Sequence, residues 1–208
     1  MMADDIRPDP YLPALVQAQR KLAERGLDTQ QIARLAGARY DAQGAAWMLP
    51  ALGRIWRISW PSLAVSFDGA EAPLDAVSRV SIINYLAYAD GVPIIGEWVP
   101  WRAFATGSLA LSAERPGHLP PLSDRFGNDV DAFRHRAARL NGRAAQFGDA
   151  SYVFDAFPRI PVLAICSAGD DEVPPSSAIL LDRSADHYLP VEDLSGVIGW
   201  VQQSLADG

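Results

Sequence analysis

Two runs of alternating apolar residues, separated by a very short break, constrain the fold of this chain more than any other feature. Trp56, Ile58 and Trp60 alternate with polar residues along residues 54–60, and the alternation resumes along residues 63–67 after a link of two or three residues. A period of two is typical of a β-strand that buries one face. Because a parallel pair needs a crossover of about a dozen residues or more, these two strands should be antiparallel.

The second half of the chain also places strand after strand. We expect strands over residues 151–157, 161–167 and 178–182. Helical periodicity marks five further segments, at residues 11–25, 28–37, 74–89, 128–141 and 194–205. Since strands follow strands more often than they alternate with helices, the predicted fold class is α+β, a mostly antiparallel sheet flanked by helices. The length of 208 residues predicts a single domain, with an N-terminal helical segment at about residues 11–37.

Local signals support several of these boundaries. Asp28 and Gln31 have the spacing of a capping box, and Gly37 follows where that short helix should end. The second half of the helix over residues 74–89 is apolar nearly all round, so this helix should run through the interior. Residues 102–126 mix Gly, Pro and Ser with short apolar pairs, and we expect mostly loop there.

Charge and cysteine content limit the classes of partner and cofactor. The net charge of −7 comes from residues 150–208, where nine acids face two bases. Such a region repels phosphate backbones, so we expect no nucleic-acid partner, and a small molecule or a protein partner stays open, as does the oligomeric state. The single Cys166 excludes an internal disulfide, and no zinc-type spacing or self-contained iron–sulfur motif occurs. No apolar run is long enough for a membrane span and no signal peptide is seen, which predicts a cytoplasmic protein.

Familiar catalytic signatures are missing. The chain has no Gly-x-Ser-x-Gly elbow, no phosphate-binding Gly-x-x-x-x-Gly-Lys, no Gly-x-Gly-x-x-Gly turn and no His-Glu-x-x-His. Its one lysine, Lys21, belongs to a helix that should be exposed, which disfavours a Schiff-base mechanism. Arg136, Arg139 and Arg143 are likewise expected on the outer face of their helix. Whether the protein is an enzyme is therefore left open.

Three constellations remain as candidate sites, and the first is acidic. Asp170, Asp171 and Glu172 directly follow a strand that should be buried. Carboxylates at a strand end are well placed to act as general acids or to bind hard cations, because the scaffold fixes them while their oxygens stay accessible. The alternative interpretation is a polar turn, since the spacing lacks the alternation and glycine of a calcium loop.

The second constellation lies between the last expected strand and the last helix. His187 stands near carboxylates that could orient its ring, so it is the histidine we select as an acid–base or metal group. The candidate metal ligands are thus Asp171, Glu172, Asp182 and His187. The alternative is a loop in which Glu192 or Asp193 merely caps the final helix.

The third constellation combines aromatic rings with an arginine. Trp98, Trp101 and Arg102 follow the expected interior helix, and with Glu97 and Tyr188 they could line a pocket for a flat or anionic ligand. Tryptophan is equally good core material, and Glu97 and Arg102 could form an internal ion pair. For any functional reading, all three constellations should open into one cavity.

A series of short matches runs along the chain in consistent order over about residues 30–205. The matches are Asn84-Tyr85-Leu86, Gly91-Val92-Pro93, Gly96-Glu97-Trp98-Val99, Arg102, Phe126-Gly127, Gly148-Asp149, Phe157-Pro158-Arg159-Ile160-Pro161, Asp171-Glu172, Pro174, Ile179-Leu180-Leu181-Asp182, Tyr188-Leu189 and Glu192-Asp193. As an ordered set they resemble a family of mainly anaerobic bacteria, the domain of unknown function numbered 3786. The chain departs from the family pattern at residues 103–107 and 166–168.

The resemblance implies a metabolic context for the protein, but it identifies no catalytic residue. Related proteins occur in anaerobes that use corrinoid and iron–sulfur methyl-transfer chemistry. We therefore expect a ligand-binding or accessory protein of anaerobic metabolism, with a tetrapyrrole, corrinoid or related cofactor as its ligand. Two alternatives stay open. One is a metal-assisted hydrolase or lyase in which Asp170, Asp171, Glu172, Asp182 and His187 converge, and the other is an acidic protein-interaction domain.

Overall fold

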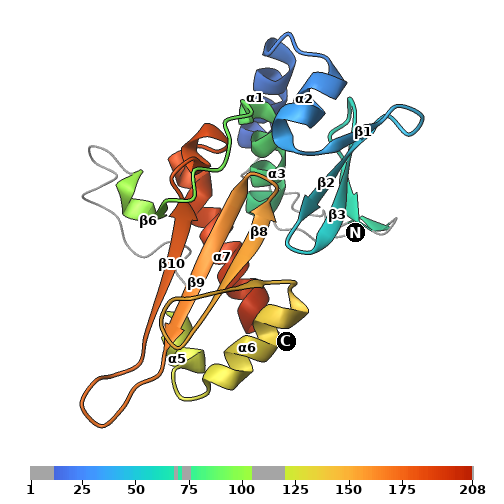
Figure 1. Ribbon diagram of the computed structural model, residues 1–208. Coiled ribbons are helices and arrows are strands. Elements are labelled where there is room, and N and C mark those ends of the chain that lie inside the picture. The colour runs from blue at the N-terminus through green and yellow to red at the C-terminus, as the bar shows by residue number, and fades with distance from the viewer. Residues whose placement is uncertain (1–11, 68–69, 72–75, 105–119, 208) are drawn as a thin grey trace, which may run out of the picture.

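The computed structural model describes residues 12–67, 70–71, 76–104 and 120–207. Within them the chain forms two antiparallel sheets of five strands with helices packed around them (Figure 1). The first sheet has the order β1 (Arg39–Asp41), β2 (Ala46–Ala51), β3 (Arg54–Ser59), β4 (Val65–Phe67) and β5 (Ala70–Glu71). The second has the order β6 (Trp98–Pro100), β10 (Ser176–Asp182), β9 (Ile160–Ser167), β8 (Ala150–Phe157) and β7 (Arg143–Ala145). The predicted α+β class with antiparallel pairing is confirmed.

The two alternating runs pair with each other as expected, and they do so through aromatic residues. Trp56 of β3 lies opposite Phe67 of β4, and on its other side it lies opposite Leu49 of β2. The sequence did not indicate β2, because Pro50 interrupts it and several of its residues are apolar in succession. β2 is nevertheless the central partner between β1 and β3.

The helices begin and end close to the predicted positions. They are α1 (Leu12–Glu24), α2 (Thr29–Ala36), α3 (Ala76–Tyr88), α5 (Leu122–Phe126), α6 (Val130–Arg139) and α7 (Val191–Ala206), with 3-10 turns η1 (Trp101–Ala103) and η3 (Ala185–His187). Asp28 and Gln31 form both bonds of the capping box, and Gly37 ends α2 at φ 67°. No helix of the described part is long and apolar enough to cross a bilayer.

The expectation of mostly loop over residues 102–126 is wrong where the structure describes it. The segment contains part of η1 at its start and all of α5 at its end. Residues 105–119 lie outside the described part of the chain. The same holds for Asp68-Gly69, where the sequence predicts a turn, and for Pro73, which it predicts at the start of the helix over residues 74–89. Gly, Pro and Ser obscured α5 because a helix of five residues spans barely more than one turn.

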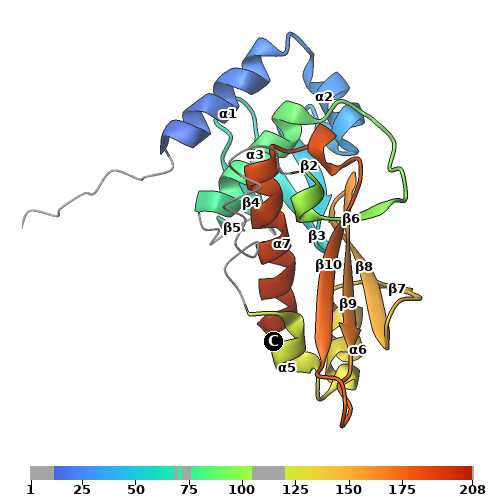
Figure 2. The same ribbon diagram turned by 90° about the vertical axis from the view of Figure 1, so that its left-hand side faces the viewer.

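The helix α7 joins the two sheets into one hydrophobic core. Figure 2 shows α7 running along the long strands β8, β9 and β10. Its Trp200 packs edge-on against Trp56 of the first sheet, with 5.8 Å between ring centroids, and lies 5.9 Å from Phe157 of the second. Residues from both sheets and from α1 to α7 belong to one cluster of buried side chains. Distant parts of the sequence therefore contribute side chains to the region where the two sheets meet α7.

Candidate functional site

The predicted acidic cluster forms the loop of the β9–β10 hairpin. The Asp170 carboxylate accepts hydrogen bonds from the backbone N–H groups of Glu172 (2.9 Å) and Val173 (2.7 Å). These bonds lower the pKa of Asp170. Asp170, Asp171 and Glu172 are all exposed. The geometry matches the polar-turn interpretation, in which Asp170 organises its own loop.

The expected convergence of the acidic cluster on His187 is wrong. Ser176, at the hairpin end of β10, lies opposite Ser167, whereas Asp182, at the other end, lies opposite Trp98. A strand of seven residues is about 20 Å long, so the hairpin carboxylates and His187 lie at opposite ends of β10. Within the described ranges, no three His, Cys, Asp or Glu side chains are grouped so that they could hold a metal ion.

Asp182, a candidate metal ligand, fastens a loop instead. Its side chain is fully buried and accepts bonds from the backbone N–H groups of Ile95 (3.0 Å) and Gly96 (2.6 Å). It also accepts bonds from the backbone N–H (3.0 Å) and the hydroxyl (2.6 Å) of Ser184. Burial alone would raise the pKa of Asp182, but these four bonds outweigh it, and the pKa is lowered. The carboxylate is thereby fully engaged in tying the loop before β6 to the end of β10.

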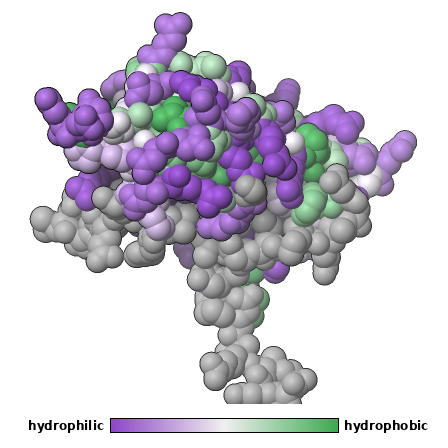
Figure 3. Space-filling model, turned by 90° about the horizontal axis from the view of Figure 1, so that it is seen from below, coloured by the Kyte–Doolittle hydropathy of each residue, from purple (hydrophilic) through white to green (hydrophobic). Residues whose placement is uncertain are grey.

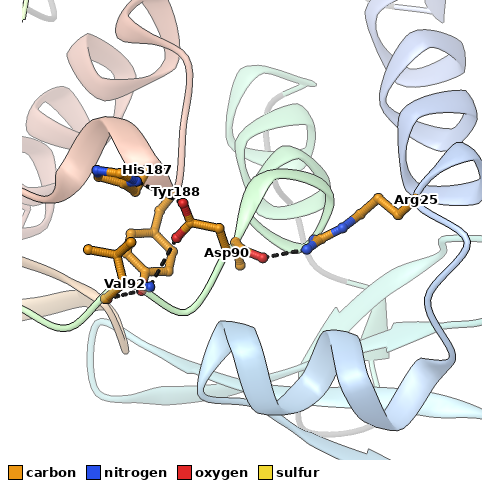
Figure 4. A network of polar contacts seen from close by, with 6 residues as sticks. Arg25, Asp90, Val92, His187 and Tyr188 are labelled. Atoms are coloured by element: carbon orange, nitrogen blue, oxygen red, sulfur yellow. Dashed lines mark hydrogen bonds and ion pairs between the residues drawn. The ribbon is translucent and has the colours of Figure 1, made fainter.

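His187 and Tyr188 belong to a polar network beside the C-terminal end of α3 (Figure 4). His187 Nδ1 lies 2.7 Å from a carboxylate oxygen of Asp90, and the Tyr188 hydroxyl donates to the carbonyl of Val92. Asp90 also accepts a bond from the Val92 N–H (3.0 Å). Burial raises the pKa of Asp90, but the Val92 N–H and His187 have the greater effect, and the pKa is lowered.

This network fastens the segment after α3 to the connection between β10 and α7. On the other side of α3, the Arg25 guanidinium donates to the carbonyls of Leu86 (2.7 Å) and Ala89 (2.5 Å), which closes the helix end. An Asp–His pair can orient an imidazole for proton transfer. Here both side chains are nearly half exposed, and the neighbours that they bind are backbone groups or each other.

The Trp98–Arg102 segment divides between packing and surface. Trp101 is 7% exposed, and its indole N–H donates to the carbonyl of Val191 (3.0 Å), so it anchors η1 to α7. Trp98 is half-buried on β6, while Glu97 and Arg102 are exposed. The structure thus gives Trp101 the packing role that we considered as an alternative.

The expected cap of the final helix is also different from the observed one. α7 begins after Pro190, which makes no side-chain capping bond, and Glu192 and Asp193 lie within its first turn. Asp193 instead accepts a bond from the Asn84 amide of α3 (2.6 Å). The carboxylate is therefore used for helix–helix contact.

A different set of aromatic and arginine side chains does surround a hollow, which we call the inter-sheet cavity because Trp200, whose ring packs against both sheets, belongs to its lining; the lining itself comes from the first sheet and the ends of α6 and α7. It has a volume of about 520 Å³. The wall from the first sheet consists of Leu52, Arg54, Trp56 and Phe67. The wall from the helices consists of Arg136, Arg139 and Leu140 at the end of α6, and Trp200, Gln203, Ser204 and Asp207 at the end of α7. Viewed from below, the described surface is mainly hydrophilic with smaller apolar areas between (Figure 3).

Aromatic rings form one continuous side of the inter-sheet cavity. Trp56 lies between Phe67 and Trp200, at centroid distances of 5.2 and 5.8 Å, and both neighbours meet it edge-on. The Trp56 indole N–H donates to the Ala51 carbonyl (3.2 Å), which fixes the ring. Edge-to-face pairs of this kind are a favourable arrangement of aromatic side chains. The rings are therefore held in place before any ligand arrives.

Positive charge faces these rings. The Arg54 guanidinium lies 4.9 Å from the Phe67 ring centroid, and Arg136 and Arg139 are in the last turn of α6. Arg136 Nη2 is buried and has no hydrogen-bond partner among the described residues. A buried donor without a partner costs about 1–3 kcal/mol, and more when it is charged.

Sequence reasoning missed this cavity and misplaced one of its arginines. Arg136 and Arg139 both line the inter-sheet cavity, but Arg139 is exposed, as we expected of both, whereas Arg136 is partly buried. A usable signal existed on β3, since alternation puts Arg54 on the same face as the buried Trp56. Arg136 also lies three residues after Phe133 and four before Leu140, on the flank of the apolar stripe.

Comparison with known proteins places the chain in a family without supplying an activity. No curated protein and no solved structure matches the chain. A family model described as "Domain of unknown function (DUF3786)" matches residues 28–203, which is most of the sequence. The range agrees with the resemblance over about residues 30–205 that the short motifs indicated. The chain therefore belongs to the family of that domain of unknown function.

Proposed function

We propose that this protein binds an anionic, ring-containing small molecule in the inter-sheet cavity. The observation that carries the proposal is the combination of three arginines, Arg54, Arg136 and Arg139, with the rings of Trp56 and Trp200 in the lining of one cavity. Ligand sites typically have volumes of about 300–1,000 Å³ and combine apolar walls with a few polar groups. The inter-sheet cavity lies within that range at about 520 Å³.

Haem-type tetrapyrroles are the first ligand class to test. Their flat ring suits Trp56 and Trp200, and their propionates suit the guanidinium groups of the lining. Among the residues that the structure describes, the lining contains no His, Cys, Met or Tyr, so the cavity would hold a porphyrin by its ring and its carboxylates and not by its iron. A cobalamin has a much bulkier outline, so the cavity would enclose only part of it. The proposal retains the role of a cytoplasmic accessory protein of anaerobic metabolism that the sequence suggested. A metal-assisted hydrolase or lyase site has no support in this arrangement, because its candidate carboxylates lie at opposite ends of β10.

Titration of the purified protein with haem tests the proposal directly. We expect saturable quenching of tryptophan fluorescence together with a shift of the haem absorbance band, because Trp56 and Trp200 line the cavity. In the Arg136→Gln, Arg139→Gln double variant, affinity should fall about tenfold or more, since two charge-assisted bonds are lost. Cobalamin, titrated in parallel, should bind more weakly than haem.

The control is Arg134→Gln, which removes one positive charge from the same helix α6 but lies outside the cavity. Arg134 is exposed and binds Asp131 and the Asp149 carbonyl. Its affinity for haem should equal that of the wild type. Non-saturable binding, or equal affinity in the double variant and the control, would remove the basis of the proposal.

A further inference from the structure

The charges around the inter-sheet cavity indicate how many negative charges its ligand should have. Its lining contains three arginines and one carboxylate, Asp207, which is exposed and accepts a bond from the Gln203 amide (2.6 Å). The formal charge of the lining is therefore +2. Arg136 is partly buried, whereas Arg54 and Arg139 are exposed, so the lining matches a ligand with two negative charges through its net charge.

The arginines come from opposite walls. Arg136 and Arg139 are three residues apart on α6, so they point to the same side of one helix. Arg54 is the first residue of β3, and its guanidinium lies over Phe67, whereas Trp200 meets Trp56 from α7. The aromatic side of the cavity thus extends from the Arg54 end toward α7, which α6 contacts. Two anion-binding points with rings between them result from this arrangement.

We propose that the ligand is a planar aromatic compound whose two negative charges are on separate acidic groups, one held by Arg54 and the other by Arg136 and Arg139. This inference rests on the proposed function and specifies the ligand class of the same cavity. Carboxylates suit both points, because guanidinium groups bind them through paired N–H donors. A compound with both charges on one phosphate has the same total charge but can reach only one wall.

Three compounds with the same naphthalene ring system distinguish these possibilities. They are naphthalene-2-carboxylate, naphthalene-2,6-dicarboxylate and 2-naphthyl phosphate, titrated against the full chain by calorimetry. We expect the dicarboxylate to bind about tenfold more tightly than the monocarboxylate, as one additional charge-assisted contact predicts. The phosphate should bind more weakly than the dicarboxylate, despite its similar charge.

The Arg54→Gln variant tests whether Arg54 binds the second acidic group of the ligand. It should lose the advantage of the dicarboxylate, while its affinity for the monocarboxylate changes less than about twofold. Arg134→Gln, with the same change of net charge, should keep that advantage. Because the comparison of the three compounds uses the wild-type protein, it stays decisive even if a variant is unstable.

The outcomes distinguish this inference from the proposed function. If the phosphate binds as tightly as the dicarboxylate or more so, the arginines converge on one group and the inference is wrong. If all three compounds bind equally, the cavity takes anionic rings but does not recognise two separate groups, so only the inference fails. If none binds and haem also fails to saturate, the proposed function fails with it.

Discussion

At the scale of single residues, Asp182 shows how a side chain that resembles a catalytic or metal-binding group can have a structural role. A carboxylate at a strand end near a histidine is a reasonable candidate ligand, and the sequence contains no sign of its true partners. Two of these partners are the backbone N–H groups of Ile95 and Gly96, which precede Asp182 by 87 and 86 residues in the sequence. Side-chain pattern could therefore reveal the residue but not its role.

The Asp182→Asn variant should unfold more easily than the wild type. Three of the four hydrogen bonds go to one carboxylate oxygen and the Gly96 bond goes to the other, so an amide, with one acceptor oxygen, loses at least one bond in a buried place and turns its NH₂ group toward a donor. We expect a loss of about 3 kcal/mol in the free energy of unfolding at pH 7, measured with a chemical denaturant. Asp170→Asn is the matched control, because its carboxylate also accepts two backbone bonds but is exposed.

The same variant has a defined pH dependence. The folded-state pKa of Asp182 is lowered, whereas an unfolded aspartate titrates near pH 3.9. The carboxylate therefore stabilises the fold above about pH 4, and this contribution is lost as the pH falls through the lowered folded-state pKa. The stability difference between wild type and Asp182→Asn should be constant from pH 7 to about pH 5 and should shrink in more acidic solution. A difference that grows in acid would contradict the role assigned to Asp182.

At the scale of elements, Tyr85 connects three parts of the fold that are far apart in sequence. It lies on α3, donates its hydroxyl to the Ala36 carbonyl at the end of α2 (2.6 Å), and accepts a bond from the Arg159 N–H between β8 and β9 (3.2 Å). Its ring stacks on Phe157 at 4.4 Å. Burial of the hydroxyl raises the pKa of Tyr85 far above its ordinary value. The phenol is thus a neutral hydrogen-bonding group in the core.

Tyr85→Phe should cost about 2 kcal/mol of stability, because it leaves a carbonyl and an N–H buried without partners. Tyr188→Phe is the comparison, since its hydroxyl donates only to Val92 and accepts no bond that we observe in the described part of the chain. That variant should lose about half as much. Denaturant midpoints with unchanged slopes would measure both losses. Equal stability of Tyr85→Phe and wild type would show that α2, α3 and the β8–β9 turn are not coupled through this residue.

The elements that the sequence predicted are those with their own periodicity. The helices α1, α2, α6 and α7 and the strands β3, β8 and β9 each span six or more residues with a clear pattern. The missed elements are β2, whose pattern Pro50 interrupts, and the short elements β1, β5, β6 and β7, of two or three residues each, and α5, of five. Such short elements exist because a neighbour pairs with them or packs on them, as β10 does with β6. Their sequences alone contain too few residues to show a period.

At the scale of the whole molecule, the inter-sheet cavity is a product of topology. Its walls come from residues 52–67, 136–140 and 200–207, which no local pattern brings together. The sequence did indicate a combination of tryptophan and arginine as the ligand-binding chemistry, but it selected the Trp98–Arg102 segment, where both types are adjacent in the chain. The two kinds of side chain meet instead across a gap between a strand and two helices. Proximity in sequence was a poor guide to proximity in space.

The most direct test of the central claim is hydrogen exchange of the backbone amides with and without haem, followed by mass spectrometry of peptides. We predict slower exchange with haem in residues 52–56, 136–140 and 200–207, because a ligand in the inter-sheet cavity contacts all three segments. Residues 98–102 and 187–190 should be unchanged. Protection confined to those last two segments, with none around the cavity, would contradict the account.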